Sequence, residues 1–278
     1  MQAAIIDYLK KATESSPWLW RVAWWSMNRL GGILPHDRSY RGLAKFPVPA
    51  DSAVLDVGAN SGISALYFLR LFSNARVLSL EPNPVHAADL RAIKRRHDRY
   101  DFKLVGAGEA EGEFTLYTPI FGSVVLHTFS SVDEAQVRSA LAKTYREDQL
   151  RRIRTESITC KLVPIDSLDI QPAIIKIDAE GHELQVLRGA RRTIERSQPV
   201  ILFEASHVSL MEICSELAQS GYQVFQYDPA SDIFTHFVGS SVPYFSGGRN
   251  LYALPRRVAA SIAMPLQEAS SEAVNDVA

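Results

Sequence analysis

Short apolar runs alternate with amphipathic stretches through the middle of the chain, and this alternation predicts strands separated by helices. The runs expected to form strands lie at 54–57, 77–80, 102–105, 173–178 and 199–204. Central strands of a parallel sheet are apolar along their length because helices cover both faces, and these runs fit that description. The pattern therefore predicts an α/β fold with a doubly wound, mostly parallel, Rossmann-like sheet.

The expected helices follow the strands. One is expected from about residue 62 to 72, with Asn60 or Ser61 as its cap, and another from Asn83-Pro84 to about residue 96. Two more strands are expected at 222–227 and 250–254. The small, polar and finally acidic residues 256–278 predict a mostly disordered tail, so the domain is expected to span 51–255.

Residues 109–170 interrupt the alternation. Strands are expected at 114–117 and 157–163, with a charged helical stretch at 132–154 between them. An insertion beside the carboxyl edge of such a sheet can supply substrate contacts or a lid. An additional sheet edge without a substrate role is the alternative.

Residues 1–50 are expected to form a helical N-terminal extension that holds all four tryptophans of the chain, Trp18, Trp20, Trp24 and Trp25. Tryptophan favours the membrane–water boundary, so peripheral membrane contact is one interpretation. The other is a helix packed over the domain or at a homodimer contact.

Composition narrows the class of protein. Hydrophobic residues make up 46% and charged residues 22%, as in an ordinary globular protein, and a net charge of -1 gives no reason to expect a nucleic-acid partner. The two cysteines suit neither a disulfide framework nor a metal site. Charged residues interrupt the first apolar stretch, so no signal peptide is expected and a cytoplasmic location is predicted.

The first predicted strand leads into a glycine turn with the spacing D-x-G-x-N-x-G, formed by Asp56, Gly58, Asn60 and Gly62. Glycines there let the backbone approach a ligand. The spacing differs from the G-x-G-x-x-G of dinucleotide-binding proteins. It resembles the first motif of Rossmann-like methyltransferases that use S-adenosylmethionine (SAM).

Three acids fall at predicted strand ends, namely Glu81, Asp178 and Glu204. The carboxyl ends of parallel strands face one crevice, so the three are expected to gather there. Glu81 follows the second strand, where a carboxylate can accept hydrogen bonds from a ribose diol.

The run 176–190 resembles the signature K-I-D-x-E-G-x-E-x-x-V-L-x-G-A of FkbM-type methyltransferases, with every fixed position met. Segment 164–168 resembles the family's T-x-D-S-L, with Pro164 in place of threonine. Segments 199–204 and 250–255 also match, so the resemblance covers about residues 40–255. It implies a class I methyltransferase sheet of seven strands with the last one antiparallel.

The resemblance further implies a SAM-dependent enzyme that methylates a hydroxyl on a sugar, polysaccharide or natural product. The residues expected at the methionine end of SAM are Asp56, Gly58, Asn60 and Gly62. Glu81 is expected at the ribose, Ala107 at the adenine, and Asp178, Glu180 and His182 beside the methyl group and the acceptor.

Two points stay open at this level. A hydroxyl acceptor gains from losing its proton during attack, and Asp178, Glu180 or His182 are the candidates to accept it. If a divalent metal takes part, Asp178 and Glu204 are the expected ligands, with His207 nearby.

Two other function classes compete with the methyltransferase. A nicotinamide-dependent oxidoreductase shares this kind of sheet, but the missing G-x-G-x-x-G counts against it. A non-catalytic SAM-binding module that docks through the tryptophans is the other, and the intact glycine turn and acids count against that.

Overall fold

The computed structural model describes residues 37–262, apart from 123, 127–128, 206–208 and 240–249. The tryptophan-rich segment, His207 and residues 263–278 lie outside the described residues, so the expectations placed on them stay predictions. None of the helices in the described part is both long and apolar enough to cross a bilayer.

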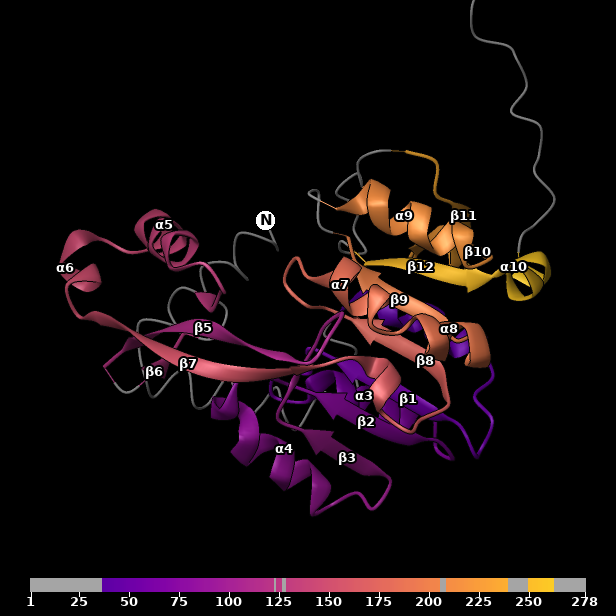
Figure 1. Cartoon of the computed structure of the whole chain (residues 1–278), viewed down its shortest axis with the longest axis horizontal. Helices are drawn as coiled ribbons and strands as arrows, with labels where there is room; N and C mark the ends of the chain where they lie inside the picture. Colours follow the sequence, from indigo (N-terminus) through magenta and orange to yellow (C-terminus); the bar gives the residue numbers. More distant parts are fainter. Residues whose placement is uncertain (1–36, 123, 127–128, 206–208, 240–249, 263–278) are drawn as a thin grey trace, which may run out of the picture.

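The described residues form a central sheet with the order β11-β10-β12-β9-β8-β1-β2-β3 (Figure 1). Its strands are β1 (Ala53–Val57), β2 (Arg76–Leu80), β3 (Tyr100–Lys103), β8 (Pro172–Ile177), β9 (Val200–Glu204), β10 (Tyr222–Asp228), β11 (Ile233–His236) and β12 (Asn250–Pro255). Strands β3, β2, β1, β8 and β9 pair in parallel, whereas β12 is antiparallel to both β9 and β10. This confirms the doubly wound sheet of the class I methyltransferase type, to which β11 adds an edge strand.

Helices cover both faces of this sheet. Their bounds are η1 (Arg38–Lys45), α3 (Ile63–Leu71), η2 (Pro84–His86), α4 (Ala87–Lys94), η4 (Ile165–Ser167), α7 (Glu183–Arg188), α8 (Arg191–Ser197), α9 (Leu210–Gln219) and α10 (Arg256–Ile262). One core lies between the sheet and η1, α3, α4 and α10, and the other between the sheet and α7, α8 and α9. The alternation along β1 shows the division, because Val54 faces the first core and Leu55 the second.

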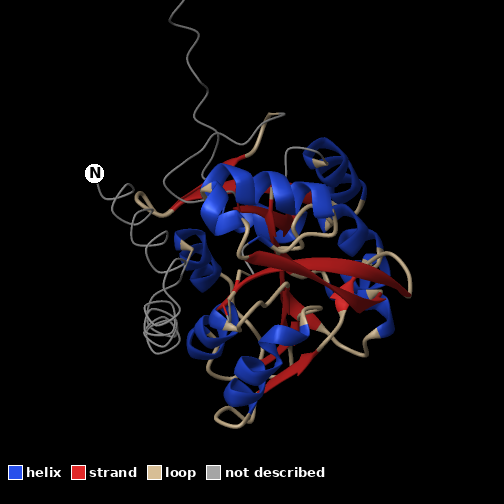
Figure 2. Cartoon of the chain, turned by 90° about the vertical axis from the view of Figure 1, so that its left-hand side faces the viewer, coloured by secondary structure: helices blue, strands red, loops and turns tan. Residues whose placement is uncertain are grey.

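The insertion forms an arm that extends from the central sheet at the left of Figure 1 and faces the viewer in Figure 2. The strands of the arm form a sheet with the order β4-β7-β5-β6. The arm also contains the helices α5 and α6. The bounds are β4 (Gly106–Ala107), β5 (Gly112–Phe121), β6 (Val124–Val125), α5 (Glu134–Thr144), α6 (Glu147–Leu150) and β7 (Ile153–Val163). Both expected strands are present and are longer than predicted. The helical stretch ends with α6 at residue 150 rather than at 154, because β7 already begins at Ile153.

Other elements also differ from the predictions, two of them toward the end of the chain. Residues 256–262 form α10, whose Ala259 is buried in the first core, where a disordered tail was expected. Strand β11 was not predicted, and β3 begins two residues earlier than expected. Tyr40, Leu43 and Phe46 are buried in the first core, so the segment just before residue 50 packs within the domain.

Candidate active site

The turn after β1 is built around Gly58. Its φ is +72°, and a Cβ placed on it would come within 1.8 Å of the carbonyl oxygen of Asp178. The amides of Gly58 and Ala59 both donate to the carbonyl oxygen of Leu80, at 2.9 and 3.2 Å. The turn is therefore held between the ends of β2 and β8, and only glycine fits at its first position.

The helix after the turn begins at a different residue from the one expected. Neither Asn60 nor Ser61 caps α3: the N-cap is Gly62, with φ of 84° and no side-chain cap. The side-chain oxygen of Asn60 instead accepts from the amide of Ser61 at 2.8 Å. A Cβ on Gly62 would approach Ile93 of α4 to 2.4 Å, so this glycine lets the two helices pack closely.

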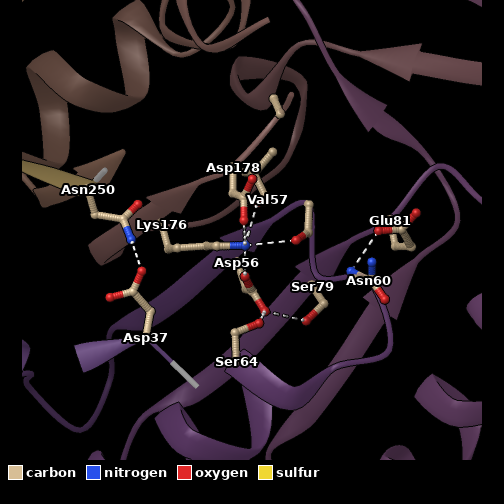
Figure 3. Close-up of polar contacts among 12 residues, drawn as sticks. Asp37, Asp56, Val57, Asn60, Ser64, Ser79, Glu81, Lys176, Asp178 and Asn250 are labelled. Atoms are coloured by element: carbon tan, nitrogen blue, oxygen red, sulfur yellow. Dashed lines mark hydrogen bonds and ion pairs between the residues drawn. The ribbon is translucent and has the colours of Figure 1, made fainter. Parts of the chain in front are cut away.

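Glu81 lies directly after β2 and is turned toward the glycine turn (Figure 3). Its Oε2 accepts from the amide of Asn60 at 2.7 Å, and its Oε1 accepts from the amide of Asn83 at 2.8 Å. The side chain is 6% exposed. Burial raises the pKa of Glu81 to about 7, and the two amide hydrogen bonds oppose that rise.

A polar row crosses three neighbouring strands just below their carboxyl ends. Asp56 of β1 is in register with Ser79 of β2 on one side and with Lys176 of β8 on the other. Ser64 of α3 donates to Asp56 Oδ2 at 2.6 Å. Asp56 is fully buried, so its place is beneath the glycine turn rather than at its surface.

Lys176 is the centre of this row (Figure 3). Its ammonium donates to the carbonyl oxygens of Gly58 at 2.7 Å and Val57 at 3.2 Å. It also lies 3.2 Å from Asp56 Oδ1 and 3.6 Å from Asp178 Oδ2. Burial acts to lower the pKa of Lys176, but Asp56, then Tyr40 and Asp178, raise it overall, so this buried side chain is a cation.

The loop after β8 carries the candidates for proton transfer. The side chain of Asp178 is 35% exposed, while Glu180 and His182 are exposed. Glu183 is fully buried and accepts from the amides of Ala179 at 3.0 Å and Gly181 at 3.1 Å. Glu183 thus holds the loop whose residues 180 and 181 both have positive φ.

Glu204, the third acid, is the last residue of β9 and is paired with Asn250 of β12. The side chain of Asn250 donates to Asp37 Oδ2 at 2.7 Å, which ties the N-terminal segment to this edge. Among the described residues, no group of three or more histidine, cysteine or acidic side chains is arranged to hold a metal ion.

Ala107 is buried in β4, next to Gly106. A Cβ on Gly106 would lie 3.6 Å from Pro82, which follows Glu81, so Ala107 lies close to the end of β2. The arm also reaches this point, where Asn83 Nδ2 donates to Thr118 Oγ1 at 3.4 Å. The structure therefore brings the glycine turn, Glu81, Ala107 and Asp178 to one edge of the sheet.

Lys176, Tyr40 and Glu183 also belong to this site, although their place in it was not predicted from the sequence. A signal for Lys176 was present, because a lysine between apolar residues of a central strand is rarely buried without a carboxylate partner. Asp56 interrupts its own strand in the same way. No comparable signal marked Tyr40, which comes from a segment outside the predicted domain.

Known proteins resemble the chain in sequence and in structure. A model of the methyltransferase FkbM domain matches residues 56–224, more than half of the chain. Methyltransferase 1 of Beauveria bassiana is 26% identical over 153 residues, which span 51% of this chain and 60% of that protein. The antimetabolite synthetase AmbE of Pseudomonas aeruginosa is 27% identical over 164 residues, 51% of this chain and 8% of that protein. A solved structure of methyltransferase FkbM from Methylobacillus flagellatus KT aligns with a TM-score of 0.47 and 21% identity, covering 75% of this chain and 44% of that one.

Proposed function

Because the chain belongs to the FkbM family of methyltransferases, we propose that it takes a methyl group from SAM and transfers it to a hydroxyl oxygen. The proposed acceptor is a sugar, a glycan or another natural product. One observation carries the proposal: the Gly58 turn is in contact with both the backbone of Asp178 and, through Asn60, the carboxylate of Glu81.

Glu81 has the capacity to hold the ribose of the donor. Each of its oxygens accepts one backbone amide, and a carboxylate offers about four lone-pair sites. One site on each oxygen is therefore left for a ribose hydroxyl. The start of α3 has no side-chain cap, which suits a turn that faces a ligand.

The methionine end of the donor is proposed to lie along the turn from Gly58 to Gly62. Gly58 has no side chain to block the approach of the donor. Asp56 lies under the turn, where its carboxylate is paired with the ammonium of Lys176. Ala107, near the end of β2, is proposed to border the adenine. This arrangement would direct the methyl group toward Asp178.

SAM supplies a methyl group that is already activated on a sulfonium, so the protein mainly has to align the acceptor oxygen. Asp178 is half-buried beside the turn and is proposed to accept the hydrogen bond of the acceptor hydroxyl. Glu180 and His182 follow on the same loop and are the other candidates to receive the proton. Their exposure makes Asp178 the better candidate.

Calorimetry with SAM and, as the competing cofactor, NAD tests the donor assignment. Wild-type protein is expected to bind SAM and not NAD. Glu81→Ala is expected to weaken SAM binding by about 1–3 kcal/mol because charge-assisted hydrogen bonds to the ribose are lost. Glu113→Ala, an exposed acid on the arm, is the matched control and should bind as wild type. Unchanged affinity in Glu81→Ala would refute the role.

The acceptor is sought separately. Incubation with methyl-labelled SAM and a cell extract, followed by mass spectrometry, identifies the molecules that gain the label. Labelled hydroxyl compounds that are absent with Asp178→Ala support the proposal, whereas label on amines or thiols alone argues against O-methylation.

A further inference from the structure

Lys176 is the feature of the site that the proposed chemistry does not use. It is 3% exposed, it carries a positive charge, and it lies under the place proposed for a positively charged donor. A cation in that position opposes binding of a sulfonium on charge alone. Its presence there therefore needs a reason other than attraction of the ligand.

The contacts of the ammonium give such a reason. An ammonium has three hydrogens to donate. Two of them are directed to the carbonyl oxygens of Gly58 and Val57, which belong to the glycine turn and to the strand that leads into it. Asp56 and Asp178 provide the negative charge that surrounds it. Lys176 thus joins the donor side of the site to Asp178.

The peptide bond between Gly58 and Ala59 is fixed from both ends by these contacts. Its carbonyl oxygen accepts from Lys176 at 2.7 Å, and its amide donates to the carbonyl oxygen of Leu80 at 3.2 Å. Glycine at φ of +72° has a wide choice of backbone conformation, so the orientation of this peptide is set by its partners.

We propose that Lys176 is a positioning residue that sets the Gly58–Ala59 peptide for the amino-acid end of the donor and holds Asp178 beside it. The inference rests on the proposed SAM site. It assigns to Lys176 a role in binding geometry that is separate from its role as the partner of Asp56 in the core.

Lys176 also neutralises the buried charge of Asp56, and this role has to be removed before its positioning role can be measured. Asp56 Oδ1 is buried, has no hydrogen bond within the described residues, and lies 3.2 Å from the ammonium. Lys176→Met alone would leave that carboxylate unpaired and destabilise the fold. The double variant Asp56→Asn with Lys176→Met removes both charges, which is often neutral for stability. The second double variant is Asp56→Asn with Lys176→Gln, in which the glutamine amide can donate to the buried carbonyl oxygens of the turn.

Two ligands separate positioning from general damage. S-adenosylhomocysteine contains the amino-acid end of the donor, and 5′-methylthioadenosine is nearly the same molecule without it. The double variants are expected to melt within about 5 °C of wild type. They are expected to bind S-adenosylhomocysteine at least about tenfold more weakly and 5′-methylthioadenosine within about twofold of wild type, by calorimetry and competition. Lys161→Met, an exposed lysine on the arm, is the control and should match wild type in all three measurements.

Any other result overturns the proposal, and the measurements distinguish the reasons. Wild-type affinity for S-adenosylhomocysteine in the double variants makes Lys176 only the counter-ion of Asp56. Equal losses for both ligands indicate general damage, and failure of both double variants to fold makes Lys176 a folding residue. If wild-type protein binds neither SAM nor S-adenosylhomocysteine, the proposed function itself fails, and the inference falls with it.

Discussion

Burial opposes the charge of two side chains at the site, Glu81 and Lys176, but their partners differ. Glu81 accepts hydrogen bonds from two backbone amides and forms no ion pair with any described residue, and burial raises its pKa to about 7. Lys176 is buried as deeply, but Asp56 and Asp178 stand beside it, and its pKa rises despite the burial. Lys176 therefore stays charged at all ordinary pH values, whereas Glu81 changes its charge near neutral pH.

This difference predicts how donor affinity depends on pH. Ribose hydroxyls donate to a carboxylate, so binding favours the ionised form of Glu81 and lowers its pKa in the complex. Affinity for S-adenosylhomocysteine is then expected to rise with pH through about 7 and to level off above it. It should be about tenfold weaker at pH 6 than at pH 8.

Glu81→Gln provides the control, because its side chain does not titrate. Calorimetry at several pH values should show a flat, weakened profile for this variant. A wild-type profile that is also flat between pH 6 and pH 8 would show that the ionisation of Glu81 is not linked to binding.

The positions of Glu81 and Asp178 could be predicted because each acid directly follows a strand, and the end of that strand places it at the edge of the sheet. Both strands are short apolar runs with clear ends. The contacts of Lys176 could not be predicted in the same way, because they depend on the register of β8 against β1. The position of Tyr40 could not be predicted either, because no local sequence pattern shows how the segment that contains it packs against the sheet.

At the scale of elements, the glycine turn between β1 and α3 is the most constrained part of the site. Gly58→Ala would place a Cβ against the carbonyl oxygen of Asp178 in a backbone conformation that alanine rarely adopts. We expect it to destabilise the fold by at least about 2 kcal/mol. Binding of S-adenosylhomocysteine should be lost, as measured by denaturant unfolding and calorimetry.

Gly112→Ala is the matched control for this variant. Gly112, at the start of β5, has nothing within 4 Å of the position that a Cβ would take. It should unfold and bind like wild type. Normal binding by a folded Gly58→Ala protein would show that the turn has room to move away from Asp178.

Elements were predicted best where a strand is an unbroken apolar run because both of its faces are buried. The parallel strands of the central sheet fall within two residues of their predicted ends for this reason. The cap of α3 was wrong because packing against Ile93 favours glycine over a polar cap at residue 62. Helix α10 was missed because it is only seven residues long and fully buries only Ala259, with Val258 and Ile262 partly buried beside it, so its apolar pattern is too short to mark a helix.

At the scale of the whole molecule, the segment before the first strand is part of the domain core. Leu43 has no exposed surface, Tyr40 contributes to the raised pKa of Lys176, and Asp37 accepts a hydrogen bond from the side-chain amide of Asn250. The segment therefore connects β12 with the polar row under the glycine turn.

A chain that begins at residue 51 is expected to be unfolded or strongly destabilised, because it lacks these buried side chains. In the full chain, Leu43→Ala should lower the free energy of unfolding by about 2–4 kcal/mol. Denaturant unfolding measures both effects. A cooperative, wild-type transition for the chain that starts at 51 would show that the segment is dispensable for folding.

The central claim is that the edge formed by Gly58, Glu81 and Asp178 holds the methyl donor, and a crystal structure with S-adenosylhomocysteine tests it most directly. The ribose hydroxyls are predicted within hydrogen-bonding distance of Glu81, with the sulfur between the Gly58 turn and Asp178. Ligand density at another place on the molecule, or a ribose that does not contact Glu81, would contradict the claim.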